Sequence, residues 1–93
     1  MSEISRQVMI VNDLGLHARA ASKLVQLASK FPVEIKIGHE DMTVNAKSIM
    51  GVLMLAAAKG TDLTLTVVGD DDKAQAAVDA VVDLIQQRFG EDR

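Results

Sequence analysis

The residues best suited to chemistry lie in the stretch DLGLHARAASKL, from Asp13 to Leu24. His17 stands where an Ala-rich segment of helical periodicity begins, and Arg19 follows two residues later. The first N–H groups of a helix lack partners within it and carry partial positive charge, so a helix start binds anions. An imidazole there is a nucleophile whose phosphoryl adduct those donors would hold, and the planar guanidinium of Arg19 matches phosphate oxygens. On spacing alone, one His near one Arg is a weak signal, and a polar cap beside a solvated arginine is the simpler interpretation.

A second candidate is Ser48, in the segment NAKSIMG. A serine at the start of a helix is a good N-cap, and from the pattern alone capping is its favoured role. The apolar residues Ile49, Met50, Leu53 and Met54 follow it. A helix this apolar must be buried or provide a docking surface, and Met suits a surface that fits several partners. We expect Leu53 and one Met to point inward.

Hydrophobic periodicity predicts the elements that position these residues. Alternating apolar residues predict four strands, at Arg6–Val11, Val33–Ile37, Met42–Val44 and Leu63–Val67. Helical spacing predicts three helices: Ala18–Phe31, stopped by Pro32; Ala46–Ala58, helical at least in part and ended by Lys59-Gly60; and a last one with a stripe at Ala74, Val78, Val81, Ile85 and Phe89. Gly15 is free to adopt a conformation that other residues avoid. The GHED segment predicts a turn, and Asp70–Asp72 predicts a turn with an N-cap.

The predicted order is β-α-β-β-α-β-α in a chain of 93 residues, which we expect to form one domain over residues 1–93. Strands with one solvated side imply a mainly antiparallel sheet whose apolar face is covered by helices, an α+β domain of two layers. Hydrophobic residues make up 48% of the chain, enough to form a core without disulfides. Unrelated functions share such layouts, so the fold alone assigns none.

Composition argues against several functions. There is no Cys, so disulfides and thiolate metal sites are excluded, which suits a reducing cytosol. The net charge is −3 and both aromatic residues are Phe, so nucleic acid, which calls for a basic stripe with stacking rings, is not an expected partner. We identify no signal peptide and no apolar run near the roughly 18 residues of a membrane-spanning helix. His39, beside Glu40 and Asp41 in the predicted turn, has no second ligand cluster at metal spacing, and we expect it to be solvated.

Two segments carry a resemblance that changes the weight of these interpretations. GLHARAAS, followed by VNAKSIMGVLMLAAAKG, resembles the two signature segments of the histidine-containing phosphocarrier (HPr) family, and the likeness covers essentially the whole chain. It implies an open-faced β-sandwich, a four-stranded antiparallel sheet covered on one face by three helices. It also implies that His17 accepts a phosphoryl group through Nδ1 from enzyme I and passes it to IIA proteins of the sugar phosphotransferase system. Arg19 then steadies the phosphate.

The resemblance has further implications for partners and docking. It implies a cytoplasmic monomer without metal or organic cofactor, which needs a donor and an acceptor protein and so is not a complete enzyme. The AKSIMGV segment is close to that of members whose serine, here Ser48, is phosphorylated by an ATP-dependent kinase/phosphorylase. The short helix after it implies docking contacts at Ile49 and Met50, and Ala20 and Leu53 complete the predicted docking set.

One position departs from the family pattern. The family usually has His-x-Arg-Pro-Ala, and Ala20 stands where the proline would be. Proline in a first helical turn pre-sets the backbone without losing a hydrogen bond, and alanine, an excellent helix former, loses only that pre-organisation. We therefore expect a small effect on transfer kinetics.

Two alternative functions are left open. One is a regulatory interaction module, in which the phosphorylation state of His17 or Ser48 controls partner binding without sugar transport. Ala20 and the well-matched Ser48 segment favour it, whereas the His17–Arg19 pair favours transport. The other alternative, a small-ligand-sensing α+β domain, needs a pocket lined by polar groups that the sequence does not reveal.

Overall fold

Four antiparallel strands form one sheet in the spatial order β1-β4-β2-β3. In the computed structural model, which describes residues 1–93, the strands are β1 (Ser2–Met9), β2 (Glu34–His39), β3 (Met42–Asn45) and β4 (Asp62–Gly69). The alternating residues Leu63, Leu65 and Val67 of β4 are fully buried. One face of the sheet is therefore apolar and must be covered.

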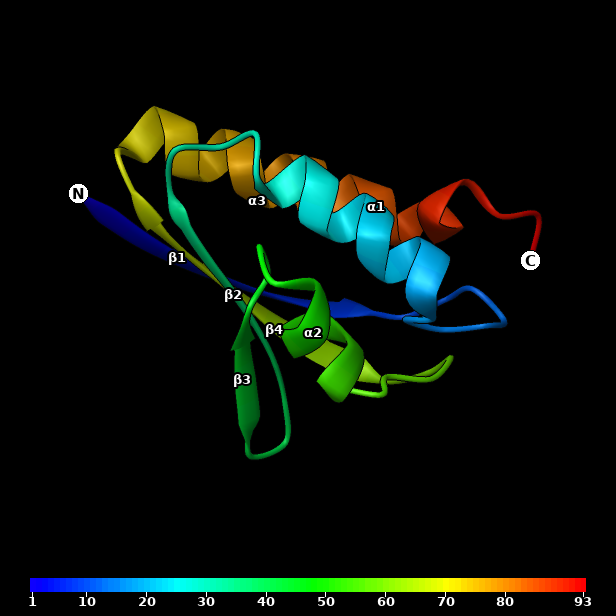
Figure 1. Cartoon of the computed structure of the whole chain (residues 1–93). Coiled ribbons are helices and arrows are strands. Elements are labelled where there is room, and N and C mark those ends of the chain that lie inside the picture. The colour runs from blue at the N-terminus through cyan, green and yellow to red at the C-terminus, as the bar shows by residue number, and fades with distance from the viewer.

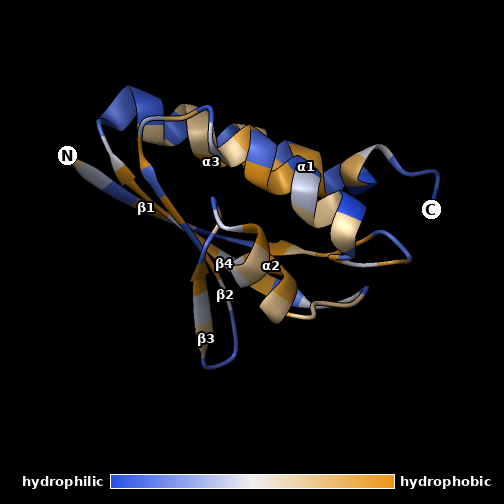
Figure 2. Cartoon of the chain, viewed as in Figure 1, coloured by the Kyte–Doolittle hydropathy of each residue, from blue (hydrophilic) through white to orange (hydrophobic).

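Three α-helices cover that face. They are α1 (Ala18–Ala28), α2 (Ile49–Met54) and α3 (Asp71–Gln86), with a short 3₁₀ turn η1 (Arg88–Gly90) after α3. Figure 1 shows α1 and α3 running side by side along the sheet, with α2 in front. Figure 2 shows hydrophilic residues on α1 and α3, whereas α2 is mostly hydrophobic. The helices and the sheet enclose 24 buried hydrophobic residues, a core that stabilises a chain with no cysteine. The predicted fold class and element order are confirmed.

Strand boundaries differ from the prediction where pairing extends the strand beyond its apolar pattern. The first strand was predicted at Arg6–Val11 but runs from Ser2 to Met9, because β1 pairs with the whole of β4. Ile10 is still buried, but its N–H group bonds to a loop carbonyl outside the sheet. His39, predicted in a turn, is the last residue of β2, because it pairs with Met42 across the hairpin.

Helix ends also differ from the prediction. α1 ends at Ala28, three residues before Phe31, because the last turn tightens into bonds between residues three apart: Phe31 N–H donates to Ala28 O at 3.2 Å. The predicted helix over residues 46–58 is reduced to α2, because Ala46 N–H donates to Ile35 O at 2.9 Å and Ala56 has a φ of 48°. Phe89, predicted on the stripe of the last helix, lies beyond α3 with a φ of 56°, yet is fully buried.

Gly15 joins the loop before α1 to the chain that follows α2. Its φ is +67°, and a Cβ there would lie 2.4 Å from Ala57 O. The next residue, Leu16, donates its N–H to the same carbonyl oxygen at 2.9 Å. Only glycine fits this approach, because both the left-handed backbone and the missing side chain are required.

Gly60 offers a matched control for Gly15, because its φ is +88° but a Cβ there would meet nothing within 4 Å. We expect Gly60→Ala to lower the free energy of unfolding by about 1 kcal/mol, the cost of a left-handed alanine. Gly15→Ala adds a backbone clash, and we expect a loss of about 3 kcal/mol. Urea unfolding of both variants measures the difference. Equal losses would show that the Ala57 contact yields without cost.

Candidate functional site

His17 is the N-cap residue of α1, as the sequence predicted. Its backbone is extended (φ −75°, ψ 178°) and its carbonyl accepts the first helical hydrogen bond, from Ala21 N–H at 2.8 Å. The N–H groups of residues 18–20 precede that bond, so they are the unpaired donors of the helix start. The imidazole makes no capping bond, which leaves the ring beside these donors and available for other contacts.

The ring of His17 is held by a residue that sequence analysis did not identify. Nε2 of His17 contacts Oε2 of Glu91, and the other carboxylate oxygen, Oε1, accepts a hydrogen bond of 3.0 Å from Nδ2 of Asn12. Nδ2 also donates to Gly15 O at 2.9 Å. Glu91 and His17 are 74 positions apart, and nothing in the local pattern of either segment signals the contact.

The pKa of the Glu91 carboxyl lies below its ordinary value. Partial burial opposes its ionisation, but hydrogen bonds from Asn12 and His17 outweigh that effect, together with the positive charge of Lys23 and that of the imidazole when it is protonated. Glu91 is therefore a carboxylate at neutral pH, and an ionised carboxylate can only accept hydrogen bonds.

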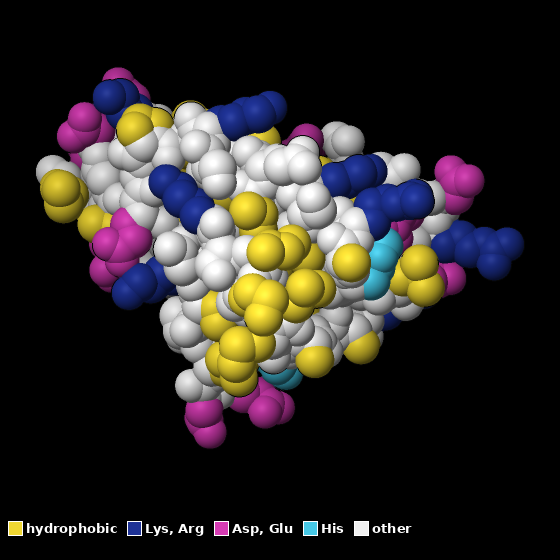
Figure 3. All heavy atoms as spheres, in the orientation of Figure 1, with side chains coloured by type: hydrophobic (Ala, Val, Ile, Leu, Met, Phe, Trp, Pro, Cys, Tyr) yellow, Lys and Arg dark blue, Asp and Glu magenta, His cyan; other side chains and the backbone are white.

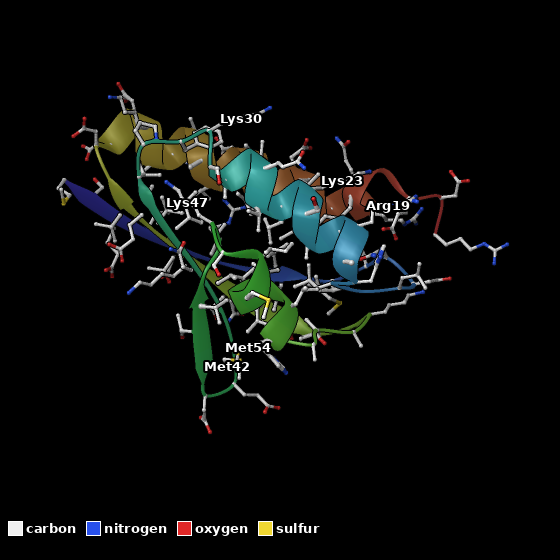
Figure 4. The ribbon with its side chains drawn as sticks, viewed as in Figure 1. Arg19, Lys23, Lys30, Met42, Lys47 and Met54 are labelled. Carbon is white, nitrogen blue, oxygen red and sulfur yellow. The ribbon has the colours of Figure 1, made fainter.

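An open hollow lies in front of His17. It is lined by Asp13, Leu14, His17, Ala18, Arg19, Glu91, Asp92 and Arg93. Arg19 is exposed and, as Figure 4 shows, lies at the start of α1 near the C-terminal segment, with Lys23 farther along the helix. The structure thus brings together the predicted pair, His17 and Arg19, at the helix start. A nucleophilic ring, helix donors and a guanidinium on one open hollow can hold an anion such as a phosphoryl group.

Beside this hollow, α2 presents an exposed apolar surface, which we call the α2 face. It consists of Ile49, Met50, Leu53 and Met54, with exposed fractions of 38%, 69%, 37% and 63%. Figure 3 shows hydrophobic side chains gathered over α2, with a histidine and basic side chains at the edge of the patch. The expectation that Leu53 and one Met point inward is wrong, because Val52 is the buried residue of α2.

Ala20 does not belong to this surface. It was predicted as a docking residue, but it is fully buried on the inner side of α1. The prediction was wrong because the third helical residue after the cap faces the core, with Leu24 one turn farther along the same face. Its place in the first turn supports the view that alanine in place of proline changes the backbone little.

Ser48 is the N-cap of α2, as predicted, and its hydroxyl accepts a hydrogen bond of 3.2 Å from Gly51 N–H. It lies at the end of α2 that is remote from His17. Lys47 reaches Phe31 O beyond the end of α1, whereas Ala57, after α2, contacts the loop before His17. The two helices therefore run in opposite directions (Figure 1), and α1 has 11 residues, or a length of about 16 Å.

The other candidate residues, His39 and Asp70, do not line the hollow at His17. Nδ1 of His39 lies 3.4 Å from Asp62 O, and Nε2 lies 3.7 Å from the exposed Glu40 carboxylate. No group of three metal-ligating side chains occurs in the chain. Asp70 is the N-cap of α3, as predicted. None of the helices has the length and hydrophobicity needed to cross a bilayer.

Fold and site together define a small α+β protein that presents a nucleophilic histidine at a helix N-terminus. Residues 4–87 match the family described as the PTS HPr component phosphorylation site. The phosphocarrier protein HPr of Cupriavidus necator is 50% identical over 95% of this chain and 97% of its own. The phosphocarrier protein NPr of Shewanella violacea is 45% identical over 98% of each. The crystal structure of HPr-C-His from Thermoanaerobacter tengcongensis superposes with a TM-score of 0.87, at 43% identity over the full length of both chains.

The chain belongs to the HPr family, the phosphocarriers of the phosphotransferase system. Such a protein is an intermediate in phosphoryl transfer and not a complete enzyme. It carries a group between partner proteins, and its own structure therefore has to provide an acceptor atom and a surface on which those partners dock.

Proposed function

We propose that His17 is the residue that carries the phosphoryl group. The observation that carries this proposal is its position as the N-cap of α1, on an open hollow that it shares with Arg19. Nδ1 has no hydrogen-bond partner within the chain, whereas Nε2 is occupied by Glu91. The lone pair of Nδ1 is thus the one available to attack phosphorus.

The helix start and Arg19 stabilise the transferred group. As the N–P bond forms, negative charge remains on the phosphoryl oxygens, and the N–H groups of residues 18–20 provide donors that need no rearrangement. Arg19 adds a permanent charge in a planar fork. Docking of a partner supplies proximity and in-line orientation, which this small protein cannot supply alone.

The α2 face is the proposed docking surface for the donor, enzyme I, and for the acceptor IIA proteins. Both partners have to reach the same histidine in turn, so both have to cover the surface next to it. Two flexible, exposed Met side chains suit a surface that packs against several partners. On this proposal the protein acts in the cytoplasm, as a monomer.

Ser48 is the proposed regulatory site for an ATP-dependent HPr kinase/phosphorylase. A phosphate there lies at a helix N-terminus next to Lys47, so the fold should tolerate it. It also adds charge next to Ile49 and Met50, which a partner must desolvate. Because Ser48 and His17 lie at opposite ends of the α1–α2 pair, we propose that such a phosphate acts on docking and not on the ring.

The alternative function is a regulatory module whose phosphorylation state controls partner binding without sugar transport. Because the chain is similar both to HPr proteins and to a phosphocarrier named NPr, we keep this regulatory module as a second candidate beside sugar transport. Transfer from the phosphorylated protein to a IIA protein of a sugar permease distinguishes the two, because the regulatory module would not support it.

The first prediction concerns the acceptor. Incubation with phosphoenolpyruvate and enzyme I should add one phosphoryl group that is labile in acid and stable in base, as expected of a phosphohistidine. His17→Ala should accept none and should stay folded, because losing an N-cap residue costs at most about 2 kcal/mol. Labelling of folded His17→Ala would mean that another residue is the acceptor.

The second prediction concerns Arg19. Because Arg19 is exposed, Arg19→Ala should slow transfer from enzyme I far more than it lowers the thermal midpoint. Arg19→Lys should restore the rate only in part, since lysine supplies charge without the planar fork. Lys30→Ala, which removes an exposed charge after the far end of α1, is the control. If all four proteins transfer at the same rate, Arg19 has no part in holding the phosphate.

The third prediction concerns Ser48. Ser48→Asp should keep its thermal midpoint but lose affinity for enzyme I, roughly tenfold, because a charge has to be desolvated at the docking surface. Ser5→Asp is the control, since Ser5 is exposed and pairs with Thr66 on the uncovered face of the sheet. Steady-state phosphotransfer titrations compare the two. An unchanged KM in Ser48→Asp and in the enzymatically phosphorylated protein would leave Ser48 as a helix cap alone.

A further inference from the structure

The last residues of the chain are held against the start of α1. Phe89 is fully buried, and its carbonyl accepts a hydrogen bond of 2.6 Å from Nζ of Lys23. Farther along, Arg93 O accepts from Asp13 N–H at 3.1 Å. Arg88 and Phe89 have φ values of 60° and 56°, a conformation that costs non-glycine residues energy and persists only where the surroundings impose it. The C-terminal tail, residues 88–93, is thus fixed by contacts on both sides of Glu91.

Within this tail the Glu91 carboxylate is oriented from both of its oxygens. Asn12 is fully buried, and its Nδ2 group donates to Gly15 O and to Glu91 Oε1. The opposite orientation of the amide would place Oδ1 against these two acceptors, so Asn12 has one favourable orientation. The Glu91 side chain is only 13% exposed. Its second oxygen is therefore fixed at Nε2 of His17.

This arrangement selects one form of the imidazole. An ionised carboxylate has no proton to donate, so the hydrogen bond between Glu91 and the ring requires a proton on Nε2. In the neutral ring a proton on Nε2 leaves the lone pair on Nδ1, the nitrogen without a partner in the chain. The other charged groups at the hollow are Asp13, Arg19, Asp92 and Arg93, and none of them forms a hydrogen bond to the ring.

We propose that Glu91 is a positioning residue for phosphoryl transfer, which holds His17 in the tautomer that has its lone pair on Nδ1. The inference rests on the proposed function of His17. In the transfer step the Nδ1 lone pair attacks phosphorus, the N–P bond forms, and the bond from phosphorus to the donor protein breaks with its electron pair going to the donor. The Nε2 proton stays on the ring throughout, hydrogen-bonded to Glu91, whose charge offsets the positive charge that develops on the imidazole.

The tautomer can be measured without any partner protein. In protein labelled with ¹⁵N-histidine, the ring nitrogen shifts of His17 above its titration should show Nε2 protonated and Nδ1 unprotonated. In Glu91→Ala the preference should weaken. In Glu91→Gln it should weaken or reverse, because the amide oxygen is needed by Asn12 and an amide N–H then faces Nε2. His39, in contact with Glu40, is an internal control whose signals should not move.

Transfer kinetics provide the second readout. Glu91→Ala should lower the turnover of phosphoryl transfer from enzyme I by about tenfold, the effect of one charge-assisted hydrogen bond. KM should change little, because Glu91 lies outside the α2 face. Glu40→Gln, which removes a carboxylate from the exposed hairpin turn, should match wild type in the His17 tautomer and in turnover.

Three results would overturn the positioning role. The first is a wild-type His17 protonated on Nδ1, and the second is a Glu91→Ala variant with wild-type tautomer and turnover. The third is a Glu91→Ala variant that transfers faster than wild type, which would mean that the tail obstructs the histidine. Failure of the wild-type protein to accept a phosphoryl group while its tautomer is as expected would contradict the proposed function of His17, and the structural role of Glu91 in orienting the ring would stand.

Discussion

The contact between Gly15 and Ala57 is the constraint on which the rest of the site depends. It brings the loop before α1 to within hydrogen-bond distance of the chain after α2, at a point where no side chain fits. Because α1 begins two residues beyond Leu16, the contact also determines where the helix N-terminus and His17 lie. Any displacement of this loop would move the ring, the helix donors and Arg19 together with respect to the α2 face.

The same constraint places the proposed phosphoryl acceptor and the proposed regulatory serine at opposite ends of one pair of helices. His17 occupies the start of α1 next to the end of the α2 segment, and Ser48 occupies the start of α2 next to the end of α1. The exposed apolar residues of α2 lie between them. A partner that reaches the proposed acceptor has to cover this surface, so a charge at the far end can oppose docking without touching the histidine. The fold thereby gives the two proposed modification sites one shared surface and no direct contact.

Much of this arrangement follows from local sequence signals. The alternation in LTLTV predicts β4 correctly, and the apolar stripe predicts α3. Each pattern repeats over several residues or helical turns. The start of α1 at His17 is predicted by the Gly-containing break before it and by the Ala-rich run after it. The length of α2 is not predicted correctly, because distant groups bind the chain on either side of this helix. The N–H of Ala46 donates to the carbonyl of Ile35 in β2, and the carbonyl of Ala57 accepts from the N–H of Leu16 in the loop before α1.

The role of the C-terminal residues is the part that sequence patterns could not reveal. Phe89 has helical spacing from α3, but the chain turns left-handed there so that the ring stays buried while the helix ends. Glu91 then meets His17 and Asn12, both from the other end of the sequence. A contact between groups so far apart depends on the packing of α1 against α3 and on the turn between them, which no local pattern encodes.

The central claim is that the phosphoryl group is carried on Nδ1 of a histidine at the start of α1. Its most direct test is nuclear magnetic resonance of the protein labelled with ¹⁵N-histidine and phosphorylated by enzyme I, with detection of the one-bond coupling between ³¹P and the ring nitrogens. The account predicts coupling to Nδ1 of His17, with Nε2 still bearing its proton. Coupling to Nε2, or a phosphorus signal bound to any residue other than His17, would contradict it.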